Sequence, residues 1–174
     1  MTRRLEEKGS EVRYEKPVEG GRKRPDDVDV KWEVTFLSLP DGASYQRGTL
    51  PFFCHDVTPR ELRVPCADAN VVHPSGAQGV KSLTIYVTED LVQELRKAYS
   101  AVTGVEEKSE GAFEVPSLYG DGTTTIYVKV PKDEGVTRGG LVLGELVLWG
   151  EGVGERKTLD VGNEGVGAIY LESR

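Results

Sequence analysis

Glu145 is the residue of this sequence whose surroundings most directly suggest chemistry. The residues expected on its face of a predicted strand are all apolar: Leu141, Leu143, Val147 and Trp149. A carboxylate among such neighbours must be paired, protonated, metal-bound or directed into a wet cavity. Glu145 is therefore a candidate catalytic acid, base or ligand. The alternative is a register shift in the strand, or an ion pair between Glu145 and a nearby arginine.

The two histidines, His55 and His73, are further candidates for catalysis. His55 lies between Cys54 and Asp56 in a predicted strand, where adjacent residues face opposite sides. It therefore need not form a nucleophile pair or an acid–base pair with either neighbour. The alternative is a half-buried histidine bonded to the backbone. His73 precedes Pro74 in a turn and can serve local structure alone.

Arginine side chains could bind an anionic substrate. Arg60 and Arg63 flank a predicted helical turn, and Arg22 precedes a predicted strand. A guanidinium group can hold a carboxylate or phosphate through two parallel hydrogen bonds. Arg22, Arg60 and Trp32 are thus candidate substrate-binding residues. The alternative is that the arginines pair with surface acids, of which the chain has 29.

Two predicted strands and one predicted helical turn must position the candidate residues between Trp32 and Arg63. Strict alternation over Val28–Phe36 predicts a strand with one buried and one wet face, and the returning strand is predicted at Leu50–Val57. Thr58 and Glu61 have the spacing of a capping box. Pro65 follows so soon that a single helical turn is expected.

A β-α-β-β-β order is predicted from Val80 onward. A strand at 80–87 precedes a helix that Thr88 caps and Gly104 ends. The apolar stripe of this helix is Leu91, Leu95, Ala98, Tyr99 and Val102. Three strands are predicted at 112–118, 124–130 and 141–149, the last apolar on both faces and therefore central and buried. A further segment, 168–171, is predicted to add an edge strand.

That element order and three local strings carry a resemblance to a known family. The strings are Gly20–Pro25 before the Trp32 strand, Leu50–Phe53 with Asp56–Pro65, and His73–Val80. In this order and spacing they resemble the vicinal-oxygen-chelate superfamily, and within it the C-terminal part of glyoxalase-like domain proteins.

The resemblance implies an α+β fold in which βαβββ modules form a curved, mostly antiparallel mixed sheet. Residues 1–174 would form a single glyoxalase-like domain, with an incomplete first module at 1–66, a complete module at 80–150 and a C-terminal extension at 151–174. Residues 3–9 have the pattern of a helix end closed by Gly9. We therefore expect structure to precede them, in this chain or another. A bare sheet edge would favour a homodimer or a partner chain that completes the sheet.

Metal-using members of the superfamily bind a divalent ion through histidine and glutamate side chains on sheet strands. The resemblance therefore permits a divalent metal as cofactor. The strand start that often carries a ligand reads Lys81-Ser82-Leu83 here, without histidine. Because an ion needs several converging donors, this ligand pattern is incomplete.

Composition restricts the compartment and the partners. The formal net charge of −7 disfavours nucleic acid, and the basic cluster Arg22-Lys23-Arg24 is followed by acids, which indicates a solvated turn. The sequence contains no secretory signal and no apolar run of membrane-spanning length, so we expect no membrane partner and a cytoplasmic location.

Two functions remain open from the sequence. The first is a small-molecule-binding protein, or a lyase or isomerase, that holds an oxygenated substrate in the cup of the curved sheet. Glu145 would then move a proton, with His55 and His73 as helpers. The second is a non-catalytic interaction module that oligomerises or pairs with a partner chain.

Overall fold

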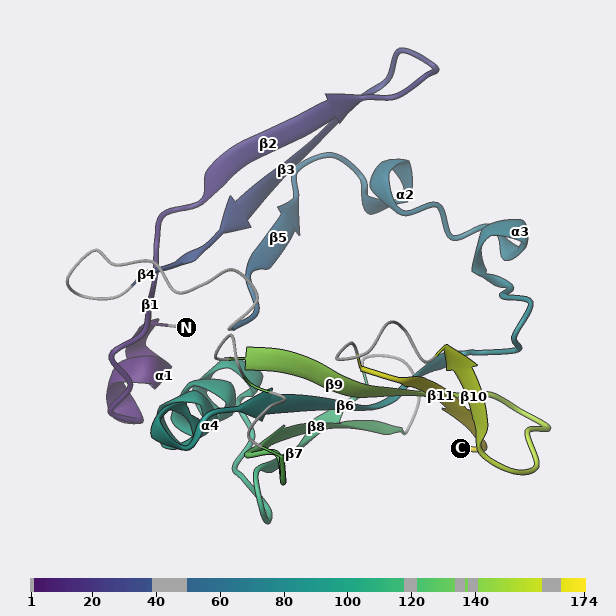
Figure 1. The fold of residues 1–174 in the computed structure, drawn as a ribbon. Coiled ribbons are helices and arrows are strands. Elements are labelled where there is room, and N and C mark those ends of the chain that lie inside the picture. Colours follow the sequence, from purple (N-terminus) through teal and green to yellow (C-terminus); the bar gives the residue numbers. More distant parts are fainter. Residues whose placement is uncertain (1, 39–49, 118–121, 134–136, 138–140, 161–166) are drawn as a thin grey trace. The chain divides into compact units, whose positions relative to one another are not determined.

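The computed structural model describes residues 2–38, 50–117, 122–133, 137, 141–160 and 167–174. It divides into two compact units, Met1–Val71 and Val72–Arg174 (Figure 1). Residue 118 of one predicted strand and residues 161–166 of the predicted extension lie outside the described residues. No helix of the described ranges is both long and apolar enough to cross a membrane.

The first unit opens with a short helix, α1 (Thr2–Glu7). Gly9 follows it with φ +65°, a left-handed conformation that glycine adopts without steric cost. The amide of Gly9 bonds the carbonyl of Glu6 at 3.0 Å, and the amide of Ser10 bonds that of Leu5 at 2.9 Å. This pair of bonds is the Schellman arrangement, which confirms the helix end predicted at Gly9.

A three-stranded antiparallel sheet follows. It consists of β2 (Val18–Lys23), β3 (Asp29–Thr35) and β5 (Phe53–Asp56), with β3 in the centre. A separate ladder joins β1 (Arg13–Tyr14) to β4 (Leu37–Ser38). The predicted strands at 28–36 and 50–57 are confirmed with shorter ends. In β3 the predicted alternation of burial holds only at Asp29, Val30 and Lys31, because both faces are half-buried from residue 32 onward.

The assignment of Arg22-Lys23-Arg24 to a turn is wrong for its first two residues, which belong to β2. Five of the six residues of β2 are exposed, so no apolar alternation marks this strand in the sequence. Its ladder to β3, running from Val18 opposite Val34 to Lys23 opposite Asp29, holds it in place.

Two single-turn helices end the first unit: α2 (Arg60–Arg63) and α3 (Asp68–Val71). The length predicted for α2 is confirmed, but the capping box is wrong. Pro59 occupies the N-cap position of α2, and no side chain caps it. The Thr58 hydroxyl instead accepts the amide of Lys31 at 3.1 Å and bonds its carbonyl at 3.3 Å, so it joins β3 to the segment before α2.

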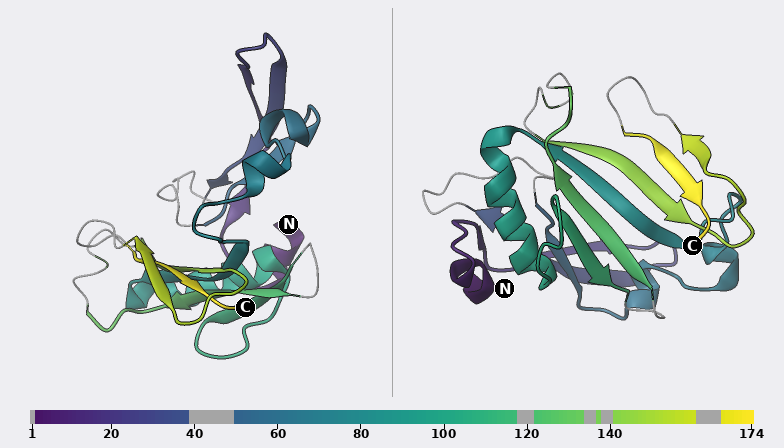
Figure 2. Two further views of the ribbon diagram at one scale, coloured as in Figure 1. Left: turned by 90° about the vertical axis from the view of Figure 1, so that its right-hand side faces the viewer. Right: turned by 90° about the horizontal axis from the view of Figure 1, so that it is seen from below.

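The second unit has the element order predicted from Val80. β6 (Gly79–Val87) leads to α4 (Glu89–Thr103), β7 (Ala112–Pro116), β8 (Thr123–Lys129) and β9 (Leu141–Trp149). With β10 (Lys157–Asp160) and β11 (Ile169–Glu172) they form one six-stranded mixed sheet, in the order β10-β11-β9-β6-β8-β7. The β6–β8 and β11–β9 pairs are parallel and the remaining pairs antiparallel. Figure 2 shows this sheet from two further sides.

The C-terminal half of this sheet departs from the prediction. The segment at 168–171 is not an edge strand, because β11 lies between β9 and β10, and β10 forms the edge. β9 is central, as predicted, but it is not buried on both faces: Leu143 is 56% exposed. The pairing of β9 with β6 shifts register between Leu83 and Ile85, and this irregularity changes which β9 side chains share a face.

One side of the sheet packs against α4. Gly104 closes α4 in the left-handed conformation, with φ 76°, as predicted. Thr88 is its N-cap residue, although its side chain makes no capping hydrogen bond. The buried core of the unit includes Leu95, Ala98 and Tyr99 from α4 and Ile85, Val87, Phe113 and Val128 from the strands. Val92 is buried where the stripe predicted Leu91, because α4 is rotated slightly from its expected orientation.

Candidate functional site

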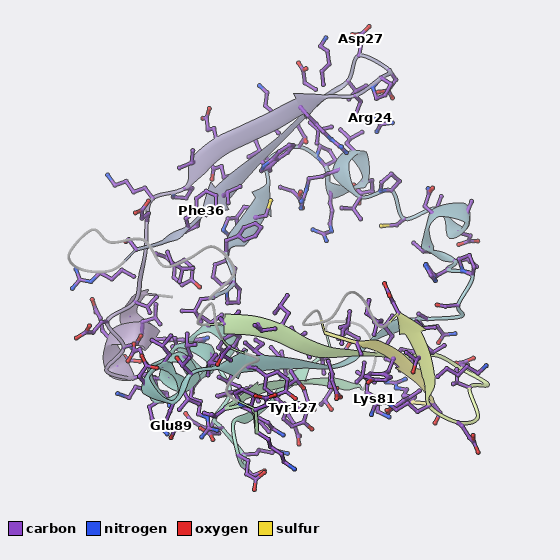
Figure 3. The ribbon with its side chains drawn as sticks, viewed as in Figure 1. Arg24, Asp27, Phe36, Lys81, Glu89 and Tyr127 are labelled. Atoms are coloured by element: carbon purple, nitrogen blue, oxygen red, sulfur yellow. The ribbon has the colours of Figure 1, made fainter. Side chains whose placement is uncertain are left out.

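Polar side chains from four neighbouring strands gather on the face of the second unit's sheet that does not carry the core. Ile85 and Val128 are buried on the other face, so the residues that alternate with them in β6 and β8 point away from α4. These polar residues line a cavity of about 470 Å³. Its lining consists of Lys81, Ser82, Thr84, Tyr86, Thr125, Tyr127, Lys129, Glu145, Val147, Arg156 and Glu172. We call this surface the open face; Figure 3 labels Lys81 and Tyr127 on it.

Glu145 belongs to an ion-pair network on the open face. Arg156 Nη2 lies 3.0 Å from Glu145 Oε2, and Arg156 Nη1 lies 3.3 Å from Glu172 Oε1. Lys81 Nζ lies 3.0 Å from the other carboxylate oxygen of Glu172. The guanidinium carbon of Arg156 also lies 3.6 Å from the ring centre of Tyr170, a cation–π contact that keeps the guanidinium group over the ring.

The network fixes the charge of Arg156. Partial desolvation opposes the charged form, but the hydrogen bond that Arg156 donates to Glu145 and the negative charges of Glu145 and Glu172 outweigh it, so the pKa of Arg156 is raised. Glu145 thus has an arginine partner and lies at a register irregularity of β9. Both alternatives given for this residue are present. Of the apolar residues predicted on its face, Val147 lines the open face with Glu145, whereas Leu141, Leu143 and Trp149 do not. Its neighbours on the open face include the hydroxyl groups of Thr84 and Tyr86.

The open face carries one more cation than it carries carboxylates. Its cations are Lys81, Lys129 and Arg156, against Glu145 and Glu172. The ammonium group of Lys129 lies 4.2 Å from the ring centre of Tyr127 and has no carboxylate partner in the described part of the chain. A negatively charged, oxygenated molecule on the open face could form an ion pair with Lys129 and hydrogen bonds with the hydroxyl groups of the lining.

These residues do not fit a divalent metal site. The two carboxylates of the open face are already paired with cations, and Lys81, Lys129 and Arg156 would repel a further positive ion. Within the described ranges, no group of three or more histidine, cysteine, aspartate or glutamate side chains converges as a metal site would require.

The predicted histidines lie elsewhere. His73 is exposed in a turn, where its Nδ1 lies 2.8 Å from the hydroxyl of Ser75 and accepts the amide of Ser75 at 3.2 Å. These contacts are those of a local structural residue. His55 belongs to the first unit, opposite Glu33 in the β3–β5 ladder, and its ring centre is 6.5 Å from that of Phe53. It is exposed, so its predicted half-buried state is wrong.

The candidate substrate-binding residues also lie in the first unit. Arg60 is exposed and pairs with Asp56 at 3.0 Å, as the alternative for the arginines anticipated. Arg63 pairs with the same carboxylate. The hydrogen bond from Arg63, helped by that from Arg60, lowers the pKa of Asp56.

Trp32 is half-buried over its cross-strand partner Gly20. A Cβ atom on Gly20 would lie 2.5 Å from the indole nitrogen of Trp32, so only glycine fits there. The second unit repeats this arrangement, with Trp149 over Gly79 at the same distance. The Trp32 ring thus has a packing role in the sheet of the first unit.

Apart from Glu145, the sequence prediction missed the charged residues of the open face: Lys81, Lys129, Arg156 and Glu172. Lys129 had a readable signal, because Thr125, Tyr127 and Lys129 form the polar half of an alternating strand. Arg156 and Glu172 had none. Their proximity to Glu145 depends on the pairing of β11 with β9, two strands that are far apart in the sequence.

Comparisons with known proteins agree with this fold. The family model described as "Glyoxalase-like domain" matches residues 1–103. A search among curated proteins found no match to the sequence. Among solved structures, a hypothetical protein from Staphylococcus aureus is similar over 99% of this chain, with a TM-score of 0.60 and 9% sequence identity. This chain spans 60% of the length of that protein.

Proposed function

Because the chain belongs to the glyoxalase-like domain family, we propose that it binds a small, oxygenated, negatively charged molecule on the open face and acts on it as a lyase or isomerase. The cavity of about 470 Å³ has the size of a small-molecule site. Its excess cation and its hydroxyl groups fit a short hydroxy acid or oxo acid. Such a ligand would place its carboxylate near Lys129.

The observation that carries the proposal is the Glu145–Arg156 pair, with 3.0 Å between nitrogen and oxygen. Arg156 holds the Glu145 carboxylate in place on the open face, where Glu145 can accept a proton from a carbon next to a carbonyl group. The positive charges of Arg156 and Lys129 then stabilise the enolate oxygen that develops. In a ligand with a hydroxyl group on the carbon that loses the proton, the hydroxyl proton then passes to the enolate oxygen, and the same carboxyl group returns its proton to the former carbonyl carbon, which completes an isomerisation.

Ligand-observed NMR with a panel of three- to six-carbon 2-oxo and 2-hydroxy acids tests the binding step. We expect Lys129→Met to weaken binding of the best ligand by roughly tenfold, because a hydrogen bond to a charged group contributes about 1.5–3 kcal/mol. Lys132→Met is the matched control. Lys132 is exposed, does not line the open face, and has no ion-pair partner in the parts of the chain described.

Exchange of ligand protons with heavy water tests the chemical step. We expect Glu145→Gln to keep binding but to lower the exchange rate by roughly 10²-fold or more, the usual contribution of a general base. The exposed Glu151 gives the control variant Glu151→Gln, which should exchange like the wild type. Equal exchange in the wild type and Glu145→Gln would refute the chemical step. Equal binding by Lys129→Met and Lys132→Met would refute the site.

We also propose that the first unit is an incomplete βαβββ module and the second unit a complete one. The element order of the second unit and the family membership support this arrangement. In the first unit a three-stranded sheet follows α1, and its two outer strands each have one open edge in the described chain. Such edges favour pairing with another chain.

A second candidate function follows from that surface: a non-catalytic module whose first unit pairs with a second copy or a partner chain. Large apolar side chains are exposed on or next to the outer strands: Val18 at 55%, Phe52 at 58% and Val57 at 59%.

Light scattering during gel filtration tests this second function. A dimer that Val18→Lys converts to a monomer, while Val72→Lys does not, would support this function. A monomeric wild type at all concentrations would refute pairing with a second copy. Val72 is 75% exposed and outside the sheet, which makes it a suitable control.

A further inference from the structure

A small cleft lies at the end of the β2–β3 hairpin, within the first unit. Its volume is about 210 Å³, and it is formed between the hairpin end and the α2 segment. The charged part of its lining consists of Arg22, Lys23, Arg24 and Arg63. Pro25, Leu62 and Pro65 contribute the apolar part. Figure 3 labels Arg24 and Asp27 at this end of the hairpin.

Backbone structure holds these arginines at the cleft. Arg24 closes the hairpin, because its amide bonds the carbonyl of Val28 at 2.9 Å and its carbonyl accepts the amide of Asp27 at 3.0 Å. Asp27 adopts φ +64°, a conformation that aspartate tolerates better than most residues. The Nη1 of Arg24 reaches the carbonyl of Leu62 at 3.4 Å and so joins the hairpin to α2. Arg22 lies two residues earlier in β2, opposite Val30.

The ion pairs around the cleft leave one positive charge unbalanced. Arg24 pairs with Asp26 at 2.9 Å, and Lys23, which also lines the cleft, pairs with Asp27 at 3.3 Å. Arg63 uses its Nε for Asp56, and its two terminal nitrogens have no partner among the described residues. Arg22 makes no ion pair within those residues.

We propose that this cleft binds a small oxyanion: a phosphate or carboxylate group held by the guanidinium groups of Arg22 and Arg63. Guanidinium nitrogens bind such groups through paired charge-assisted hydrogen bonds. Of the apolar lining residues, Leu62 is half-buried and Pro25 and Pro65 are exposed, so these bonds form at a solvent-accessible surface. The volume is below the range of about 300–1,000 Å³ usual for larger ligands, so the cleft takes one oxyanion group.

This site is separate from the open face, since all its residues belong to the first unit. Loss of binding here would therefore leave the proposed reaction at Glu145 untouched. The converse also holds, so failure of one proposal does not imply failure of the other.

Amide NMR shifts during titration test the proposal. The titrants are potassium phosphate and potassium acetate, each compared with potassium chloride at equal ionic strength. We expect saturable shifts at Arg24–Asp27 and Leu62–Arg63 with phosphate or acetate and none with chloride. The stronger of the two anions identifies the group that the cleft prefers. Arg22→Gln should weaken this binding at least about tenfold.

Arg13→Gln is the matched control. Arg13 is exposed in β1 of the same unit, and neither it nor Arg22 has an ion pair within the described residues, so the two variants remove equal charge without loss of a structural contact. We expect Arg13→Gln to bind phosphate as the wild type does. Equal weakening by both variants, equal shifts with chloride, or no saturable shift with either oxyanion would overturn the proposal.

Discussion

Replacing Gly111 with alanine should disrupt the second unit far more than an alanine replacement in a similar backbone conformation elsewhere. Gly111 has φ +80°, and a Cβ atom at this position would overlap the carbonyl oxygen of Val128. That carbonyl accepts a hydrogen bond from Arg96 Nε at 3.2 Å. The amide of Val128 in turn bonds the carbonyl of Gly111 at 2.9 Å. Because the Val128 side chain is fully buried, β8 cannot retreat without disturbing the core.

The magnitude follows from three contributions. The left-handed backbone costs alanine about 1 kcal/mol. The weakened hydrogen bonds at Val128 cost about 1 kcal/mol. The shift of a packed core strand costs about 1–3 kcal/mol. We therefore expect Gly111→Ala to lower the free energy of unfolding by about 3–5 kcal/mol, or the melting temperature by roughly 10 °C.

Gly76→Ala supplies the control. Gly76 has φ +78°, but nothing lies within 4 Å of the place that an alanine Cβ would occupy, so only the backbone cost of about 1 kcal/mol applies. Urea unfolding is followed by tryptophan emission in a Trp32→Phe background, where Trp149 reports on the second unit alone. Equal losses of stability in the two alanine variants would refute the close approach of β8 to Gly111.

Three further predictions concern stability. Burial raises the pKa of Tyr14 to about 12 from 10.0, so the folded state favours the neutral phenol. The contribution of Tyr14 to the free energy of unfolding should therefore be fully present below pH 10. It should fall by about 1 kcal/mol, after discounting for partial exposure, as pH rises to 12. Urea midpoints should show this loss in the wild type and not in Tyr14→Phe. The pKa of Asp56 is lowered from 3.8, so its contribution is present above that pH and is lost as pH falls through the lowered value; Asp56→Asn should flatten this part of the acid unfolding curve. Leu95→Ala should destabilise the protein by about 2–5 kcal/mol in the same urea assay, because Leu95 is fully buried in the helix–sheet core.

Local patterns in the sequence predicted the elements whose residues carry their own signal. The alternation of β3 and the apolar stripe of α4 with Gly104 at its end depend on neighbours a few residues apart, and both elements are confirmed. β2 carries no such signal, since its residues are mostly exposed and only its ladder to β3 defines it. Thr58 had a cap pattern, but its hydroxyl is used by the backbone of β3.

The candidate site likewise contains residues that a local sequence pattern indicates and residues that no local pattern indicates. Glu145 could be selected because a charged residue in an apolar strand is conspicuous. Its face could not be predicted, because the irregular pairing of β9 with β6 changes the alternation. Arg156 follows β9 in the chain and meets Glu145 and Glu172 on the open face beside the parallel β11–β9 pair, which no sequence spacing indicates.

The central claim, that the open face is the ligand site, is tested most directly by mapping amide shifts with the best-binding acid of the panel. Saturable shifts in β6, β8, β9 and β11, with an affinity that Lys129→Met weakens roughly tenfold and Lys132→Met leaves unchanged, are the predicted result. Absence of saturable shifts in these four strands, or shifts there with the same affinity in Lys129→Met as in the wild type, would contradict it.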